Sequence, residues 1–276
     1  MKNKIMMVLG FVVFFFVLLG SYVWLANETE TATGPVKIIT IQTKDDADCT
    51  LLYQDGAAVL IDTGEEQDAE HIVEVLKQNN ITKLDCMILS HSDKDHVGGA
   101  LAILHAIPVE RVVESPYEEA NERMLEINHY LEANGIPVLY PTRTWRLQAG
   151  GMQLLIYPPL EKHYNDSNNY SLATLVQHEN VNLLFTGDAL RKRSEELLLI
   201  EWPKIDLYKV PHHGRKNSKS RDMFEVLQPQ YGVVTAKSAD GDVLEAALEV
   251  GTELFFSGEQ ECCFISNGEI LTIEKE

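Results

Sequence analysis

Short hydrophobic runs and changes in their period divide the chain into predicted strands and helices. In the first half, alternating apolar residues with many β-branched side chains predict strands at 36–43, 50–54, 57–64, 84–90 and 109–115. Apolar residues that recur with helical spacing predict helices at 71–78, 100–107 and 121–135. The last of these ends at Gly135, a residue type that commonly follows the final turn of a helix.

The second half repeats this arrangement. Strands are predicted at 136–140, 152–158, 170–177, 181–188, 205–210 and 231–237, and three more close the chain at 253–258, 261–266 and 270–275. Helices are predicted at 193–201, 221–228 and 244–250. In each half, short hairpin strands come first and strand–helix alternation follows. This order predicts an α/β fold with two sheets packed face to face and helices outside.

The N-terminus differs from the rest because residues 5–26 form an uncharged, mostly apolar run. At about 1.5 Å per residue, 22 residues are long enough to cross a hydrocarbon core. Lys2 and Lys4 precede the run and Glu28 and Glu30 follow it, which predicts that the remainder faces outward from the cytoplasm. We therefore predict a signal-anchor at 1–26, a polar tether at 27–35 and an extracytoplasmic domain at 36–276. The alternative is a protein secreted after cleavage of the signal.

Composition places the predicted domain among ordinary globular proteins, with 45% hydrophobic and 24% charged residues. The chain has 42 acidic residues against 23 lysines and arginines, a formal net charge of −19. Such a surface repels nucleic acid and anionic lipid at long range, so phosphate binding would need a local basic patch. The four cysteines match no zinc or redox spacing, and we interpret them as small buried residues.

Polar clusters follow several predicted strands, and they carry the chemistry. They contain Asp62, the segment from His91 through Asp93 and Asp95 to His96, Asp188, and the pair His212 and His213. Residues that follow strands gather at a sheet edge, and imidazole and carboxylate groups there can hold one or two divalent ions. Two cations can activate a shared water for attack. An acidic loop containing histidine is often only solvated, but four such clusters in sequence favour a metal site.

In order and residue type, these clusters resemble the motifs of the metallo-β-lactamase superfamily of hydrolases. More narrowly, the chain resembles the soluble hydrolase domain of the ComEC DNA-uptake channel family, through Asp93, the segment NNYSL at 168–172 and the segment VPHHGRKNS at 210–218. The resemblance covers essentially all of residues 36–276. It implies an αββα sandwich with the metals at one edge.

The resemblance also implies roles for the clustered residues. His91 and Asp93 would hold a first metal ion, Asp95 and His96 a second, and Asp188 would bridge the two. His213 would complete the second site, leaving His212 to face substrate, and the catalytic residues would be Asp95 and His212. Asp62 would orient the ligand loop through hydrogen bonds.

This chain departs from the superfamily at the first metal position. Where the superfamily has a further histidine, NNYSL offers only Asn168 or Asn169 as weak substitutes. The cofactor prediction is two divalent ions, Zn²⁺ or Mn²⁺, with the harder ligands favouring Mn²⁺.

Basic residues cluster beside two of the predicted ligand segments, at Arg191, Lys192, Arg193, Arg215, Lys216, Lys219 and Arg221. They favour an anionic substrate, most simply a phosphodiester, with Arg215, Lys216, Asn217 and Ser218 as substrate-binding residues. Nucleic acid enters only as a candidate substrate. The alternatives are hydrolysis of another ester or a lactam, or a non-catalytic binding protein that kept the fold.

Overall fold

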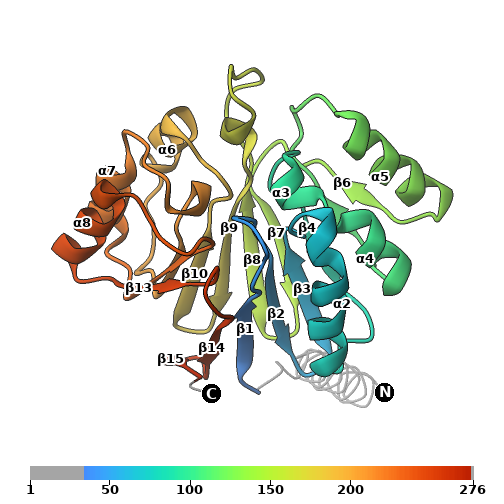
Figure 1. Ribbon diagram of the computed structural model, residues 1–276, viewed down its shortest axis with the longest axis horizontal. Coiled ribbons are helices and arrows are strands. Elements are labelled where there is room, and N and C mark those ends of the chain that lie inside the picture. The colour runs from blue at the N-terminus through green and yellow to red at the C-terminus, as the bar shows by residue number, and fades with distance from the viewer. Residues whose placement is uncertain (1–33, 275–276) are drawn as a thin grey trace, which may run out of the picture. The chain divides into compact units, whose positions relative to one another are not determined.

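Two sheets packed face to face form the centre of the fold in the computed structural model, which describes residues 34–274 (Figure 1). The predicted signal-anchor at 1–26 and nearly all of the predicted tether at 27–35 lie outside the described residues. A search of the described residues finds no helix with the length and apolar character needed to span a membrane.

The first sheet has eight strands in the order β15-β14-β1-β2-β3-β4-β5-β6. Its strands are β1 (Val36–Thr40), β2 (Thr50–Gln54), β3 (Ala57–Ile61), β4 (Cys86–Ile88), β5 (Val112–Val113), β6 (Val138–Leu139), β14 (Cys262–Ser266) and β15 (Leu271–Ile273). Pairing is antiparallel from β15 to β3 and parallel from β3 to β6. The end of the chain thus completes the sheet that its beginning starts.

The second sheet has seven strands in the order β13-β12-β11-β10-β9-β8-β7. They are β7 (Trp145–Ala149), β8 (Met152–Tyr157), β9 (Ala173–His178), β10 (Val181–Phe185), β11 (Leu207–Lys209), β12 (Tyr231–Val234) and β13 (Glu253–Phe256). It too is antiparallel at first, from β7 to β10, and then parallel to β13. The predicted order of hairpin strands before strand–helix units is confirmed in both halves.

Helices cover the two outer faces. In Figure 1, α2 (Ala69–Gln78), α4 (Ala100–Ala106) and α5 (Glu122–Ala133) lie on one side of the sheets. On the other side lie α6 (Arg191–Leu197), α7 (Ser220–Leu227) and α8 (Gly241–Val250). Successive side chains of a strand point to opposite faces of its sheet. In β10, Leu183 packs between the two sheets, whereas its neighbour Leu184 packs with Phe224 of α7. Three cores in four layers confirm the predicted αββα sandwich.

Some elements differ from the sequence-based boundaries. Strands β5 and β6 are only two residues long, and α6 and α8 begin earlier than predicted. Strand β7 was missed because it is an edge strand whose residues Trp145, Arg146 and Gln148 are exposed, so it has no continuous apolar face. Three of the four cysteines, Cys49, Cys86 and Cys262, are buried, in agreement with their interpretation as small buried residues.

The two sheets bring the polar clusters to one edge. Asp62 follows β3, His91 follows β4, Asp188 follows β10 and His212 follows β11. Parallel strands end at the same edge, which explains why β3 and β4, and β10 and β11, deliver their clusters together. The short helix α3 (Lys94–Val97) and two tightly packed glycines then turn the chain into α4.

Gly98 can be tested by substitution because its backbone lies against that of the β3–α2 connection. A Cβ at Gly98 would lie 2.5 Å from Lys94 O and 2.7 Å from Glu65 Cα, both of them backbone atoms that cannot move away alone. We expect Gly98→Ala to lower the free energy of unfolding by about 1–3 kcal/mol in urea titrations. Gly241→Ala is the matched control, since a Cβ there has no neighbour within 4 Å. Equal stability of the two variants would contradict the close packing of this loop.

Candidate metal centre

The backbone around the strand ends is tightly constrained. Asp62 N donates to Ile88 O at 2.8 Å and Thr63 N donates to His96 O at 2.7 Å, which joins the β3 end to the ligand loop. Asp62, His212 and His213 have φ values of 59°, 53° and 52°, a left-handed conformation that is uncommon for residues other than glycine. Such conformations persist where the surrounding structure determines them, and they cluster at functional sites.

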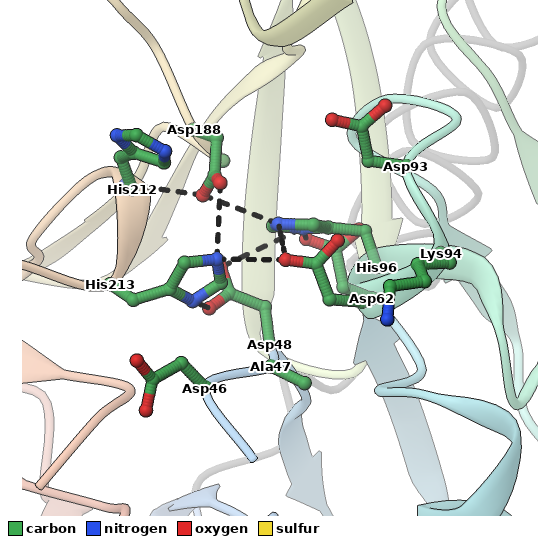
Figure 2. A network of polar contacts seen from close by, with 12 residues as sticks. Asp46, Ala47, Asp48, Asp62, Asp93, Lys94, His96, Asp188, His212 and His213 are labelled. Carbon is green, nitrogen blue, oxygen red and sulfur yellow. Dashed lines mark hydrogen bonds and ion pairs between the residues drawn. The ribbon is translucent and has the colours of Figure 1, made fainter. Parts of the chain in front are cut away.

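Two imidazole rings are each oriented by a buried carboxylate (Figure 2). The His96 Nδ1 atom lies 2.8 Å from Asp62 Oδ2, and Asp62 also accepts hydrogen bonds from the Ser90 backbone and hydroxyl. The His213 Nδ1 atom lies 3.1 Å from Asp48 Oδ1 and 3.0 Å from Thr235 Oγ1. A carboxylate on Nδ1 fixes the ring and leaves Nε2 available as a ligand atom.

Both Nε2 atoms face the same carboxylates. Asp188 Oδ1 lies 3.2 Å from His96 Nε2, and Asp188 Oδ2 lies 3.1 Å from His213 Nε2. Asp95 Oδ2 lies 3.0 Å from His213 Nε2 and 4.0 Å from His96 Nε2. The structure therefore brings together the four residues predicted for the second metal site. Two imidazole nitrogens and two carboxylates suit a divalent ion such as Zn²⁺ or Mn²⁺.

Buried nitrogen atoms without hydrogen bonds support this fit. His96 Nε2 and His91 Nε2 are fully buried and satisfy no hydrogen-bond geometry. Each faces a carboxylate oxygen, at 3.2 Å from Asp188 and 3.5 Å from Asp93 respectively. Imidazole nitrogens and carboxylate oxygens gathered in this way are suited to share a bound cation.

Asp48 and Lys209 belong to this cluster, although sequence reasoning missed both. Asp48, His96, Asp188 and His213 each offer a ligand atom within 4.8 Å of the others. Asp48, however, is already engaged: it pairs with His213 Nδ1, Thr235 and the ammonium group of Lys209. Asp48 is therefore placed to orient His213, and Asp95 remains the carboxylate predicted to bind metal.

Lys209 is almost completely buried beside the predicted ligands. Its ammonium group donates to Gly187 O at 3.1 Å and lies 3.5 Å from Asp188 Oδ1. A charged residue inside the apolar strand segment IDLYKV was the available signal for Lys209. For Asp48 the signal was its place just before β2, which runs antiparallel to β3 and so starts where β3 ends.

The charges of the cluster shift its pKa values. Burial alone would raise the pKa of Asp188, but His96, His213 and Lys209 hold that pKa well below its usual range. Burial lowers the pKa of His213, but the carboxylates of Asp188 and Asp48 outweigh this effect and raise that pKa to about 10. The pKa of His96 is raised in the same way by Asp188, Asp48 and Asp62, against its burial. The cluster thus has an excess of negative charge that favours a bound cation.

The residues predicted for the first metal position are less closely assembled. His91 Nε2 lies 3.5 Å from Asp93 Oδ2, and Asp93 stands apart from the contact network in Figure 2. Asn168 lines the cavity above the centre together with Asp93 and Asp188. Asn169 Oδ1 accepts a hydrogen bond from the Arg193 backbone at 3.0 Å. Of the two asparagines, the structure therefore leaves Asn168 as the candidate ligand.

The residues predicted to bind substrate separate into two groups. His212 and Arg215 line the cavity, and the His212 backbone donates to Asp188 Oδ1 at 3.1 Å. Lys216, Asn217 and Ser218 are not among the residues that line it. Lys216 pairs with Asp242, and Asn217 bonds Ala189 O and the Lys219 backbone.

Comparison with known proteins agrees with this geometry. The model of the metallo-beta-lactamase superfamily matches residues 43–234. The chain belongs to the metallo-beta-lactamase superfamily. Members of this superfamily are usually metal-dependent hydrolases. The match includes every predicted ligand, together with Asp48 and Lys209.

The narrower resemblance is also confirmed. The chain is 28% identical to ComE operon protein 3 of Bacillus subtilis over 227 residues, which are 75% of this chain and 29% of that protein. It is 29% identical to Recombination protein 2 of Haemophilus influenzae over 192 residues, 68% of this chain and 22% of the relative. The matched region thus spans less than a third of either relative.

Solved structures of the superfamily show the same fold. YhfI from Bacillus subtilis aligns with a TM-score of 0.59 at 14% identity, covering 81% of this chain and 96% of YhfI. CmlA from Streptomyces venezuelae, a diiron β-hydroxylase, aligns with a TM-score of 0.52 at 12% identity, covering 83% of this chain and 53% of CmlA. At these identities the likeness establishes the fold.

Asp62 can be tested through metal affinity. Asp62→Asn removes the charge that orients His96 while keeping the side-chain shape, so we expect the affinity for Zn²⁺ or Mn²⁺ to fall about 10–100-fold. The measurement is competition with a chromophoric chelator. Asp222→Asn, at an exposed carboxylate paired with Lys219, is the matched control and should bind like the original protein. Unchanged affinity in Asp62→Asn would show that His96 is positioned by other contacts.

Lys209 can be tested through the stability of the metal-free protein. Lys209→Met leaves the buried Asp48 carboxylate without its cation, so the free energy of unfolding should fall by about 3–5 kcal/mol. Urea titration in the presence of a chelator measures this change. Lys37→Met is the control, because Lys37 pairs with Glu274 at the surface, where both side chains are more than a third exposed, and it should contribute less than about 1 kcal/mol. A similar loss in both variants would rule out a special role for Lys209.

Proposed function

We propose that this chain is a metal-dependent hydrolase of phosphodiesters. The observation that carries the proposal is the convergence of His96 Nε2, His213 Nε2, Asp95 and Asp188 at one sheet edge, with Nδ1 of each ring held by a buried carboxylate. We propose two divalent ions, Zn²⁺ or Mn²⁺, the first held by His91, Asp93 and Asn168 and the second by the converging set. Asp188 would serve both ions.

A bound divalent ion would lower the pKa of water and polarise a phosphoryl oxygen. The chain's own residues would then position the substrate. The His212 side chain borders the cavity, and burial lowers its pKa, so its ring is neutral near pH 7 and can accept or donate a hydrogen bond. Arg215, at the rim, can hold a phosphate oxygen.

The charge of the cavity over the candidate metal centre supports an order of binding in which metal ions bind before the substrate. It has a volume of about 570 Å³ and is lined by six carboxylates, from Asp45, Asp46, Glu65, Asp93, Asp95 and Asp188, against the two cations of Lys94 and Arg215. Its net formal charge of −4 would repel an anionic phosphodiester. Two divalent ions would neutralise that charge, which couples substrate binding to metal occupancy.

The basic cluster gives less support to an anionic substrate than its sequence position suggested. Arg193 is buried and pairs with Glu196 at 2.7 Å, so it supports the fold. The other basic residues have acidic partners as well: Glu195 pairs with Arg191 and Lys192, Asp242 with Lys216, Asp222 with Lys219, and Glu245 and Glu249 with Arg221. Only Arg215 of this group lines the cavity.

Nucleic acid is the polymer that fits the relatives best, because one is named a recombination protein and another a competence protein. We further propose that the domain works outside the cytoplasm, tethered by residues 1–26. This localisation is supported by the uncharged run at 5–26 and by the lysines before it. Secretion after cleavage is the alternative.

Metal content distinguishes an enzyme from a binding protein that kept the fold. Full-length protein in detergent, dialysed after loading and measured by elemental analysis, should retain two ions per chain. Asp188→Ala should lose both because it removes the shared carboxylate. One ion or none in the unmodified protein would favour the non-catalytic alternative. The missing nitrogen ligand at the first metal position is the observation that supports this alternative.

An activity assay tests which kind of bond the protein hydrolyses. Protein stripped of metal and reloaded with Zn²⁺, Mn²⁺ or Fe²⁺ should cleave bis-p-nitrophenyl phosphate or single-stranded DNA. We expect Asp188→Ala to reduce the rate at least about 100-fold, since electrostatic stabilisation by the ions supplies several kcal/mol. Asp222→Ala, at an exposed carboxylate, should leave the rate unchanged. Cleavage of a cephalosporin instead would assign a lactam substrate, and a folded protein inactive with every metal would overturn the proposal.

A further inference from the structure

A second, smaller cavity is bordered by His91. Its volume is about 150 Å³, and its walls come from the end of β4, the segment after β5, and α5. Apolar side chains of Leu89 and Met124 form part of its surface. Its charged lining residues among those described are all acidic: Glu114, Glu118 and Glu119.

Two acceptor atoms in this cavity lack partners. Glu114 is 3% exposed, and its Oε2 accepts from Asn128 Nδ2 at 3.3 Å, while Glu114 Oε1 and Asn128 Oδ1 make no hydrogen bond. Burial raises the pKa of Glu114 to about 7, although Asn128 and Tyr140, which face its carboxyl group, lower that pKa. Buried acceptors in this state favour a ligand that donates hydrogen bonds.

The remaining polar groups of the cavity are already committed. The Ser115 hydroxyl donates to Tyr170 O at 2.7 Å, and the Ser92 hydroxyl donates to Glu118 Oε1 at 2.7 Å. Burial and the neighbouring Glu114 carboxylate raise the pKa of Tyr140 to about 12, so its hydroxyl keeps its proton beside that carboxylate. The Tyr140 hydroxyl also interacts with Asn128, but its single proton can serve only one of the two acceptors. The acceptor pair, Glu114 Oε1 and Asn128 Oδ1, therefore shares one donor and can accept further hydrogen bonds from a ligand.

Size and wall chemistry indicate an organic group rather than an ion. A cavity of about 150 Å³ can hold a molecule as large as benzene, and Leu89, Ala120 and Met124 supply an apolar part of this wall. A bare divalent ion would instead require three or more oxygen ligands around a much smaller space. A planar ring that carries an amino group satisfies both the apolar part of the wall and the acceptor pair.

We infer that this cavity binds an amino-bearing nucleobase, the nucleoside part of the phosphodiester substrate. The assignment rests on the proposed function, and it names the substrate class as nucleotide. An exocyclic amino group, such as N4 of cytosine, offers two N–H donors to Glu114 and Asn128. Uracil has a carbonyl oxygen at the same position, which would face two acceptors.

The position of the cavity fits this role. His91 lines it and is also the predicted ligand of the first metal ion. Glu118 accepts hydrogen bonds from both the backbone and the hydroxyl of Ser92, which fixes the wall next to His91. A base held there would lie next to the loop that carries the predicted metal ligands.

Cytidine and uridine are the matched probes, because they differ mainly in the amino and carbonyl groups of the base. Binding is measured by calorimetry on the full-length protein in detergent, with a chelator present so that metal plays no part. Cytidine should bind at least about tenfold more tightly than uridine, since uridine leaves the acceptors unpaired. This comparison requires no variant. Equal binding of the two nucleosides, or no binding of either, would overturn the assignment.

Two variants locate the contact. Glu114→Gln keeps the shape of the side chain but replaces one acceptor with an amide, and should weaken cytidine binding at least about tenfold. Glu122→Gln, in the first turn of α5 and outside the cavity lining, should leave it unchanged. Full cytidine affinity in a folded Glu114→Gln protein would overturn the assignment.

Asp188→Ala separates this inference from the proposed function. It should abolish hydrolysis while leaving cytidine affinity unchanged, because Asp188 does not line the cavity. If cytidine binds but no metal-loaded protein cleaves a phosphodiester, the cavity assignment stands and the proposed hydrolase does not. If phosphodiesters are cleaved and the two nucleosides bind equally, the hydrolase stands and the cavity assignment falls.

Discussion

The buried carboxylate of Asp188 is the group on which the centre depends. It is 2% exposed, and removing a charge from water carries a large free-energy cost unless other groups compensate. Here the compensation comes from His96, His213, Lys209 and the His212 backbone, all within 3.5 Å of its oxygens. These groups follow or end two different strands, β4 and β11. The edge of the sandwich is therefore organised around one charge.

The centre also explains why both sheets are needed. His96 and its orienting carboxylate Asp62 come from the first sheet, whereas Asp188 and His213 come from the second. Asp48, at the start of β2 in the first sheet, orients His213 of the second, so each sheet supplies a partner for the other. These side chains stay in contact only if the apolar cores, between the two sheets and under the helices, keep the edges of the two sheets aligned. The apolar packing and the polar site are thus parts of one arrangement.

The sequence predicted the layers and most of the residues that converge at the candidate metal centre, because both follow from local patterns. Alternation identifies β10, and a polar cluster after it identifies Asp188. Asp48 and Lys209 could not be placed in the same way, since their roles arise from pairing across the two sheets and not from spacing in the chain. The basic residues near Arg193 were misinterpreted for a different reason. Glu196 lies three residues after Arg193 in the predicted helix, so helix spacing alone could have identified their ion pair. The burial of Arg193 arises from tertiary packing, which spacing does not show.

Charge at the cavity mouth shapes how a substrate could be selected. A chain of net charge −19 with six carboxylates around the centre provides no long-range attraction for a polyanion. Under the function proposed above, selectivity would come from contacts made after the substrate arrives. These contacts are bound ions that would neutralise the cavity, Arg215 at its rim, and the acceptor pair of Glu114 and Asn128. The loop after β4 joins these contacts, because His91 borders the second cavity while His96, five residues later, belongs to the candidate metal centre. Chemistry and substrate choice would then depend on the same short segment.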